Sequence, residues 1–441
     1  MTECTGQGEL FGNMGRARIE AAFDGGDISS DAGGALLLRQ AERRLGVLAA
    51  AANCLPDHRD PRKVRHSRLS QLKQRVFAIA LGYEDLNDHD TLREDWGLRV
   101  ALNQRGAASS ASTLCRFEQV MGRAEAMALH GVLIENFIAG QATPPSELTL
   151  DLDATDDAVH GKQEGRFFHG YYDQYCFLPL YVFCGDELLT AYLRPANIDG
   201  AKHAAAIVKL LVTRLRQAWP EVRITIRADS GFCRRRLLGW CERNDVSYVI
   251  GLAKNVRLNA LAASAMNAAQ VQFELTGEKQ RGFDEFRYAA GTWSTDRRVI
   301  VRYEHGAQGA NPRYIVTNRD DHAAELYDEV YCQRGEMENR IKEQQLGLFA
   351  DRTSCSAWWP NQFRLLLASL AYTLMQGIRR IGLQGTELAR AQCTTIRLRL
   401  FKIGAAIIRS VRRIRLLLAS QCPYRELFML VAKRLHPRPS G

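Results

Sequence analysis

Residues 146–250 constrain the fold more than any other part of the chain, because strand and helix patterns follow one another there in a fixed order. Residues 148–153 alternate apolar and polar side chains, as a half-buried strand does. The remaining patterns read in turn as two strands, a helix, a strand, a helix and a strand, over residues 175–184, 187–194, 200–217, 222–228, 232–243 and 246–250. The pattern therefore predicts an α/β fold.

Three strands, a helix and a further strand, with another helix later in the chain, is the element order of a ribonuclease-H-like core. The pattern becomes strand-rich between 255 and 318, and helical character returns at 321 and extends past 345. We therefore expect a ribonuclease-H-like catalytic core that is interrupted by a β-rich insertion.

Helix patterns dominate the segment before this core, and the Ala-Thr-Pro-Pro run at 142–145 breaks them. Ser30 and Asp31 are expected to cap a helix that Gly46 ends, and another helix is expected from Ser112. Five regions are predicted: a helical region 1–145, core segments 146–254 and 319–390 on either side of the insertion domain 255–318, and a basic region 391–441.

Two aspartates stand where strands of the predicted core end. Asp153 closes the first strand and Asp229 follows the strand 222–228. Each alone is typical of a turn or a helix cap, but adjacent strands would bring both carboxylates together. Asp151 lies on the same strand face as Asp153 and stays an alternative, and Asp156 is a more remote one.

A third carboxylate is expected from the helix pattern after residue 321, because two divalent ions need more ligands than two aspartates supply. At 100° per residue, one stripe of about 80° contains Tyr331, Arg334, Glu338, Lys342 and Gln345. Glu336 and Glu343 point elsewhere. The alternative is a surface ladder of i,i+4 pairs, which would only stabilise the helix.

Three motifs together resemble the DDE transposases of bacterial insertion sequences. They are Asp153-Ala154-Thr155, residues 227–232, and Tyr331-x2-Arg334-x3-Glu338-Asn339, with the shorter matches His160-Gly161, Gln163, Arg194-Pro195 and Asn197. The likeness is to the branch with a β-strand insertion before the glutamate, and it runs from about residue 10 to 435. The 109 residues between Asp229 and Glu338 leave room for that insertion.

The resemblance implies cut-and-paste transposition, with a hairpin at the DNA ends. Asp153, Asp229 and Glu338 would hold two Mg²⁺ ions, or Mn²⁺, while Tyr331 and Arg334 contact phosphates of the transposon end. The family usually has Lys where this chain has Gln345, and Lys342 on the same stripe could compensate. The implied partners are terminal inverted repeats, target DNA and a second copy of the chain on DNA.

Further DNA contacts are expected outside these motifs. A basic cluster at 59–75, which includes Arg62, Lys63, Arg65 and Arg68, suits phosphate binding, and the helix from Ser112 suits base reading. Trp293 could stack on an extruded base. The alternatives are a solvated basic face, an ordinary capped helix and a buried tryptophan.

All of the net charge of +10 lies in residues 391–441, which have eleven lysines and arginines against one acid, Glu426. Arginine alternates with aliphatic residues at 396–400 and again at 413–416. This alternation favours a basic β-hairpin, followed by a helix over 423–435, with a helical tail as the alternative. Either form could bind DNA or a second subunit.

The 11 cysteines are too few for a disulfide framework, and none are spaced as CxxC. The apolar runs are shorter than the roughly 20 residues of a membrane span, so we expect a soluble, cytoplasmic protein. Two other functions stay open: a non-catalytic DNA-binding regulator derived from a transposase, and a metal-dependent nuclease of the same fold.

Overall fold

The computed structural model describes residues 10–22 and 30–437 and divides into two compact units. The first unit contains the described residues up to Asn136, then Asp157–Gly165, and those from Lys342 onward. The second contains Phe137–Asp156 and Arg166–Ile341. Each unit is described by itself.

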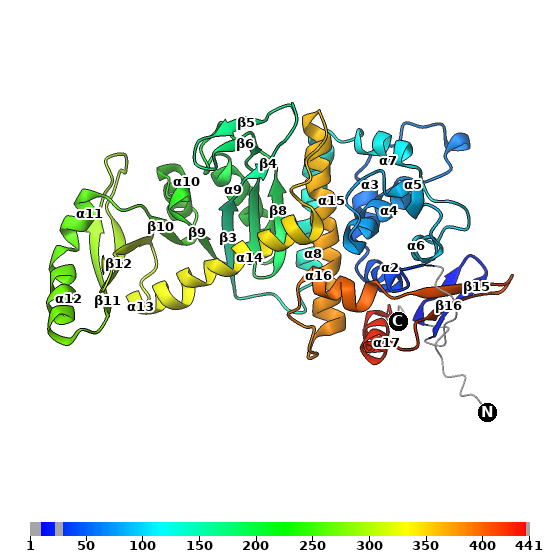
Figure 1. Cartoon of the computed structure of the whole chain (residues 1–441). Helices are drawn as coiled ribbons and strands as arrows, with labels where there is room; N and C mark the ends of the chain where they lie inside the picture. Colours follow the sequence, from blue (N-terminus) through cyan, green and yellow to red (C-terminus); the bar gives the residue numbers. More distant parts are fainter. Residues whose placement is uncertain (1–9, 23–29, 438–441) are drawn as a thin grey trace. The chain divides into compact units, whose positions relative to one another are not determined.

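The second unit is built on one mixed sheet of nine strands (Figure 1). Its strands are β3 (Glu147–Ala154), β7 (Leu180–Cys184), β8 (Glu187–Tyr192), β9 (Arg223–Ala228), β10 (Ser247–Leu252), β11 (Gln280–Tyr288), β12 (Arg297–Gly306), β13 (Gly309–Ala310) and β14 (Arg313–Thr317). The spatial order is β11-β12-β14-β10-β9-β3-β7-β8, and β13 pairs with β12.

Five of these strands form the ribonuclease-H-like core that the element order predicted. β3, β7 and β8 are antiparallel neighbours, whereas β9 is parallel to β3 and β10 is parallel to β9. The carboxyl ends of β3, β9 and β10 therefore lie at the same edge of the sheet.

The inserted segment continues this sheet, because β14 pairs antiparallel with β10, and β12 and β11 follow. Its first part is helical, with α11 (Val256–Leu261) and α12 (Ala263–Thr276). The alanine-rich sequence of α12 explains why this stretch is helix where a β-rich segment was expected.

The remaining helical elements of the second unit follow the strands. They are α9 (Ala204–Ala218), η2 (Ser230–Phe232), α10 (Arg235–Arg243), α13 (Ala323–Glu325), the π-helical turn η3 (Leu326–Tyr331) and the 3₁₀ turn η4 (Cys332–Arg334). The path then continues as α14 (Gly335–Lys342). A separate hairpin is formed by β5 (Phe167–His169) and β6 (Gln174–Phe177).

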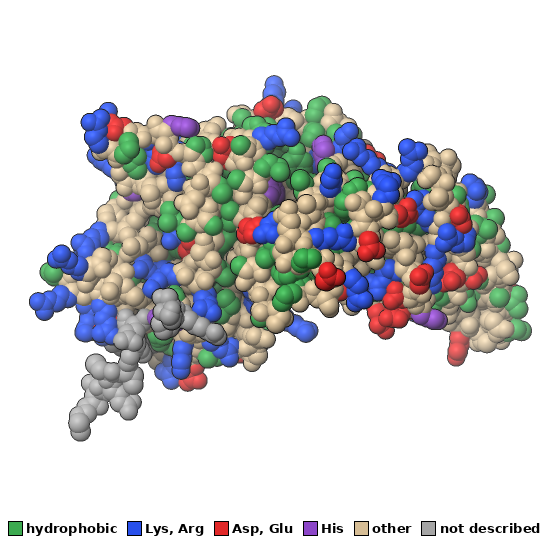
Figure 2. All heavy atoms as spheres, turned by 180° about the vertical axis from the view of Figure 1, so that it is seen from behind, with side chains coloured by type: hydrophobic (Ala, Val, Ile, Leu, Met, Phe, Trp, Pro, Cys, Tyr) green, Lys and Arg blue, Asp and Glu red, His purple; other side chains and the backbone are tan. Residues whose placement is uncertain are grey.

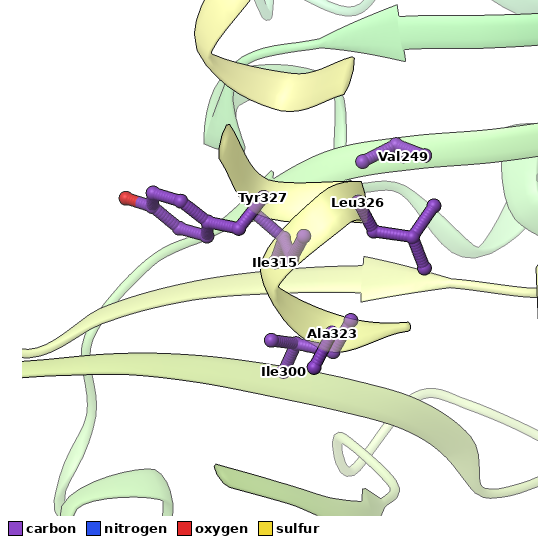
Figure 3. Close-up of a cluster of buried hydrophobic side chains, with 6 residues drawn as sticks. All are labelled: Val249, Ile300, Ile315, Ala323, Leu326 and Tyr327. Atoms are coloured by element: carbon purple, nitrogen blue, oxygen red, sulfur yellow. The ribbon is translucent and has the colours of Figure 1, made fainter. Parts of the chain in front are cut away.

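The start of the helical path from α13 to α14 is anchored on the sheet by buried apolar side chains. Leu326 and Tyr327 of η3 pack with Val249 of β10, Ile300 of β12 and Ile315 of β14 (Figure 3). Ala323 belongs to the same cluster. Burial of these side chains fixes the position of this part of the path on the sheet, and with it the position of Tyr331, which packs against the cluster.

The first unit is mainly helical. Its helices are α2 (Ala35–Leu45), α3 (Val47–Asn53), η1 (Pro61–Lys63), α4 (Arg68–Leu81), α5 (His89–Leu92), α6 (Trp96–Leu102), α7 (Ala111–Glu118), most of α8 (Arg123–Ala139), η5 (Glu343–Gly347), α15 (Trp358–Gly377), η6 (Ile378–Leu383), α16 (Cys393–Ile396), η7 (Arg397–Phe401) and α17 (Arg425–Leu435). Almost every side chain of α15 is buried, and this helix contacts α2, α3, α4 and α7. It forms the centre of the unit's core.

Two local expectations for the N-terminal helices had different outcomes. Gly46 ends α2 with a φ of 69°, a left-handed conformation that glycine adopts without strain, so this prediction is confirmed. The predicted Ser30-Asp31 cap is wrong, because α2 begins after Gly34. Ser30 instead pairs its backbone with Ala405, and its hydroxyl donates to Asp95.

The basic tail contains both secondary structures that the sequence allowed. Residues 396–400, expected as a strand, lie in the helical turns α16 and η7. The hairpin is β15 (Ala405–Arg409) with β16 (Arg413–Leu418), and α17 follows within the expected range. β16 also pairs with β2 (Ala17–Ala22), which pairs with β1 (Asn13–Met14).

The other short strand of the first unit is β4 (Asp157–Ala158). Among the residues described, none of the helices combines the length and apolarity that crossing a membrane requires.

Candidate active site

Asp153 and Asp229 lie at the same sheet edge, at the ends of two adjacent parallel strands. Leu152 of β3 is in register with Ala228 of β9, and one aspartate follows each of these residues. The Asp229 carboxylate accepts a 2.9 Å hydrogen bond from the Gly231 amide and caps η2. The carboxyl ends of parallel strands thus bring together two aspartates that are 76 residues apart.

The helical path from α13 to α14 brings a cation and a third carboxylate to these aspartates. Arg334 Nη1 lies 3.6 Å from Asp153 Oδ2, and Arg334 Nη2 donates a 2.7 Å hydrogen bond to Glu338 Oε1. Arg334 is therefore a bridge between the strand end and the helix. The Arg334–Glu338 pair of the i,i+4 ladder considered from the sequence is therefore present. Arg334 also reaches Asp153 on the sheet, so the pair does more than stabilise the helix surface.

The charges around Asp153 change its proton affinity. Its pKa is raised to about 7, mainly by burial, with smaller contributions from the charges of Asp229 and Glu338, while Arg334 lowers it. Burial lowers the pKa of Arg334, but Asp153, Tyr331, Glu338 and Asp229 together raise it above its usual value. This cluster of three carboxylates holds a positive charge strongly.

The other glutamates of the helix pattern have different partners. Glu336 accepts a 2.9 Å hydrogen bond from Arg340, and Glu343 is paired with Arg379 in the first unit. Of the three candidates, Glu338 is the one whose charge acts on Asp153.

Asp151 and Asp153 have different partners: Asp151 pairs with Arg227, whereas Asp153 lies near Arg334. The Asp151 side chain is fully buried and forms a bidentate ion pair with Arg227, its direct neighbour in β9. Arg227 also donates a 2.5 Å hydrogen bond to the backbone carbonyl of Val330. The pair therefore ties β3 and β9 to the segment just before Tyr331, and Asp151 serves as support for the site.

The family model described as transposase DDE domain group 1 matches residues 11–440. The chain belongs to this family. In this DDE-domain protein, the matched region covers both the carboxylate cluster and the helical first unit.

The curated proteins and the solved structures differ in whether they match the chain. No curated protein matches this DDE-domain sequence. Among solved structures, the chain is similar to piggyBac transposase in a synaptic complex with hairpin DNA, at 12% identity and a TM-score of 0.42. That match covers 92% of this chain and 82% of the piggyBac chain.

A polar pocket of about 250 Å³ adjoins Asp229 on the same sheet edge. It is lined by Ser230, Gly251, Leu252, Ala253, Lys254, Arg313, Tyr314, Tyr327 and Tyr331. Gly251 is needed there, because a Cβ atom at this position would lie 2.6 Å from the Tyr331 hydroxyl. The pocket combines two cations with three tyrosines beside Asp229.

Sequence reasoning found Tyr331 but missed Lys254 and Arg313. A signal for Lys254 was present, since it follows the end of the strand predicted at 246–250, next to the strand that ends at Asp229. Arg313 starts β14 and could not be placed, because its antiparallel pairing with β10 was not predicted.

The remaining predicted DNA contacts of the site region are Lys342, Gln345 and Trp293. Lys342 and Gln345 belong to the first unit, and their roles stay predictions. Trp293 lies between β11 and β12, in edge contact with Tyr288 and below the guanidinium of Arg297. The Trp293 ring therefore packs against residues that flank it in the chain, Tyr288 of β11 and Arg297 of β12.

The basic cluster of the first unit divides into exposed and packed side chains. Arg62, Lys63 and Arg65 are exposed, although Arg62 pairs with Asp60. Arg68 is largely buried over the Phe117 ring and donates to the Pro56 carbonyl. On the face in Figure 2, Lys and Arg are prominent on the side of the first unit, whereas the inserted segment carries both charge signs.

Proposed function

We propose that the protein is a transposase that cuts DNA at the ends of a mobile element and joins the freed 3′-hydroxyls to target DNA. The observation that carries this proposal is the position of Asp153 and Asp229 at adjacent parallel strand ends, with Arg334 3.6 Å from Asp153 and hydrogen bonded to Glu338. It lies on a ribonuclease-H-like sheet in a chain of the transposase DDE family.

The chemistry of these side chains fits Mg²⁺ or Mn²⁺, because carboxylate oxygens are the ligands that such hard cations prefer. In the described parts of the chain, no three His, Cys, Asp or Glu side chains are already close enough to hold a metal ion. Glu338 is hydrogen bonded to Arg334 instead. When bound, two such ions supply an activated water or 3′-hydroxyl and stabilise the leaving oxygen.

The chain's own groups bind and orient the phosphate. Arg334 reaches Asp153 and Glu338 at once, so a phosphate entering this edge meets its guanidinium. Lys254 and Arg313 provide charge at the neighbouring pocket, where Tyr331 can donate a hydrogen bond. The Asp151–Arg227 pair holds the helix that carries Arg334.

Binding to two element ends calls for two active sites, so we also propose a homodimer on DNA that forms hairpin ends. Size-exclusion chromatography with light scattering, with and without end DNA, measures whether the protein is a dimer. Denaturing gels of the cleaved ends distinguish hairpins from open breaks.

The test of the proposed function uses DNA carrying inverted repeats found on either side of the coding sequence, with Mg²⁺. Asp153→Asn, Asp229→Asn and Glu338→Gln should each lower cleavage at least about 100-fold while end binding stays within about threefold. Glu336→Gln is the matched control, since its carboxylate lies on the same helix and pairs with Arg340.

The products separate the three functions. Cleavage followed by joining of 3′-hydroxyl ends supports the transposase. Cleavage without joining would indicate a nuclease, and end binding without cleavage a regulator. Normal cutting by Glu338→Gln would overturn the site assignment.

A further inference from the structure

A hairpin rich in exposed aromatic side chains follows the first catalytic strand of the second unit. β5 and β6 pair antiparallel, with Phe168 opposite Tyr175, and the hairpin projects from the sheet (Figure 1). Four aromatic side chains are exposed, with fractions of 40% for Phe167, 52% for Phe168, 85% for Tyr171 and 49% for Tyr175. Such exposure of large rings indicates a binding surface.

The two faces of the hairpin differ in what they contact. Gln174 and Cys176 point inward, where Gln174 Nε2 donates to Asp156 Oδ2 at 2.5 Å and Cys176 is buried. Phe168 and Tyr175 point outward and meet edge to face, with ring centroids 5.6 Å apart. The Arg166 guanidinium lies 4.7 Å from the Tyr175 ring centroid. The outward face is therefore aromatic with a cation at its edge.

The turn of the hairpin lies close to the catalytic strand end. Tyr172 packs with Ala154, the residue after Asp153, against the buried cluster of Cys176, Leu178 and Ala196. The charge of Asp153 is among the causes that raise the pKa of Tyr172 to about 12, after burial and Asp156. Tyr171 stacks edge to face on Tyr172 at 5.0 Å and extends outward. The exposed rings are thus connected to Asp153 through one tyrosine.

The place of this surface, more than its composition, selects its occupant. Every apolar side chain from 166 to 175 is aromatic. Aromatic rings and arginine are common in protein interfaces too, but this surface lies beside the strand end that carries Asp153. Flat rings with an adjacent arginine are what unpaired nucleobases stack on, and this stacking tolerates any base sequence. A phosphodiester held at Asp153 would bring its flanking bases to this hairpin.

We propose that Phe168, Tyr171 and Tyr175 form a stacking platform for unpaired DNA bases next to the phosphodiester that the carboxylates attack. The inference rests on the proposed function and extends it, since it assigns the base contacts to β5–β6. Trp293, the residue expected to stack on a base, has contacts of the same kind with Tyr288 and Arg297, and it is the alternative that the crosslinking test distinguishes.

The first test measures binding of a fluorescein-labelled oligothymidine of about 20 nucleotides, and of a duplex of equal length, to the full chain in EDTA. Phe168→Leu with Tyr171→Leu should weaken oligothymidine binding about tenfold or more, while duplex binding changes less than about twofold. Phe168→Tyr with Tyr171→Phe keeps the rings and should bind as wild type does. Equal binding by the leucine variant, or an equal loss for both DNAs, overturns the platform.

The second test locates the base directly. Oligothymidine containing 5-iododeoxyuridine is irradiated with the protein, and the crosslinked peptide is identified by mass spectrometry. A crosslink within residues 166–176 supports the platform, whereas one at Trp293 or at Tyr314 overturns it. A lower oligomeric mass of the leucine variant without DNA would identify the surface as an interface between copies, and also overturns it.

Neither measurement needs catalysis, so its outcome is separate from the proposed function. A wild-type protein that binds oligothymidine through these rings but never cuts end DNA would contradict the transposase proposal alone. Cleavage and joining with no effect of the leucine substitutions on binding would contradict the platform alone.

Discussion

At the scale of single residues, the Asp151–Arg227 pair determines where the helix with Glu338 can lie. Both side chains are almost completely buried, and Arg227 uses a further donor, on Nη1, for the Val330 carbonyl. Removing one charge leaves the other buried without a partner, which costs more than removing both.

Arg227→Met should lower the free energy of unfolding by about 3–5 kcal/mol, since the Asp151 carboxylate stays buried and unpaired. The double variant Asp151→Leu with Arg227→Met should recover a large part of this loss. Urea unfolding of the full chain measures both. If the double variant is as unstable as the sum of the single ones, the pair does not act as one unit.

His89 is a second residue whose environment fixes its charge. Gln74 Nε2 lies 3.0 Å from Nδ1 and Arg75 Nη1 lies 3.1 Å from Nε2, so both ring nitrogens face donors. The orientation of the Gln74 amide is set by Ser109. Burial first, and then the Arg75 charge, lower the pKa of His89 to about 3.

The first unit should therefore lose stability in mild acid. Below the usual histidine pKa of about 6.5, His89 binds a proton in the unfolded chain but stays neutral in the folded chain. The free energy of unfolding therefore falls as pH falls. The contribution is about 1.4 kcal/mol per pH unit. Urea midpoints between about pH 7 and 4.5 should show a shallower pH slope for His89→Gln than for wild type. Identical slopes would contradict a neutral His89.

At the scale of elements, the helical path from α13 to α14 departs from the ideal helix that the sequence suggested. It runs through the π turn η3 and the 3₁₀ turn η4 before α14 begins. A π turn frees backbone groups from the regular pattern, and the Val330 carbonyl within it accepts from Arg227. The irregular turns thus allow the helix to be fixed to the sheet.

Gly251→Ala should disturb this attachment. The added Cβ would lie 2.6 Å from the Tyr331 hydroxyl and 2.8 Å from the Ser230 amide nitrogen, so the tyrosine or the η2 backbone must move. We expect end cleavage to fall about tenfold or more, because a displacement of about 1 Å in a catalytic arrangement has such effects. The control is Gly291→Ala, where no neighbouring heavy atom lies within 4 Å of the added Cβ. Equal cleavage by both variants would contradict this reading of Gly251.

The sequence predicted elements whose period and order were clear, and missed those that depend on distant contacts. Asp153 and Asp229 were found because parallel strand ends share an edge. The helical period favoured Glu338 over Glu336 and Glu343, and the charge of Glu338 does act on Asp153, although the real path is not a regular helix. Its catalytic role stays a prediction. The pairing of Arg227 with Asp151 and the helical turns at 393–401 were not predicted, because their partners come from far along the chain.

At the scale of the whole molecule, the positive charge of the tail is carried by a folded part of the first unit. β16 pairs with β2, and α17 contacts α2, so removing residues 391–441 would remove core as well as charge. Arginines on this tail therefore have to be tested by substitution.

Arg412→Gln with Arg413→Gln should weaken DNA binding for every DNA sequence to a similar extent. Both side chains are exposed at the hairpin turn. Each lost phosphate contact should lower the slope of log K against log salt concentration by about 1. Lys209→Gln, an exposed lysine on α9, is the matched control. An unchanged slope would show that these charges do not meet DNA.

The pairing of β2 with β16 has a consequence for protein synthesis. The N-terminal strand leaves the ribosome early, but its partner strand at Arg413–Leu418 is made almost 400 residues later. At bacterial or eukaryotic elongation rates this interval is roughly 20 to 80 s. During that time α2 and its neighbours lack part of their cover, so chaperones that bind nascent chains should associate with this protein until the last fifty residues emerge.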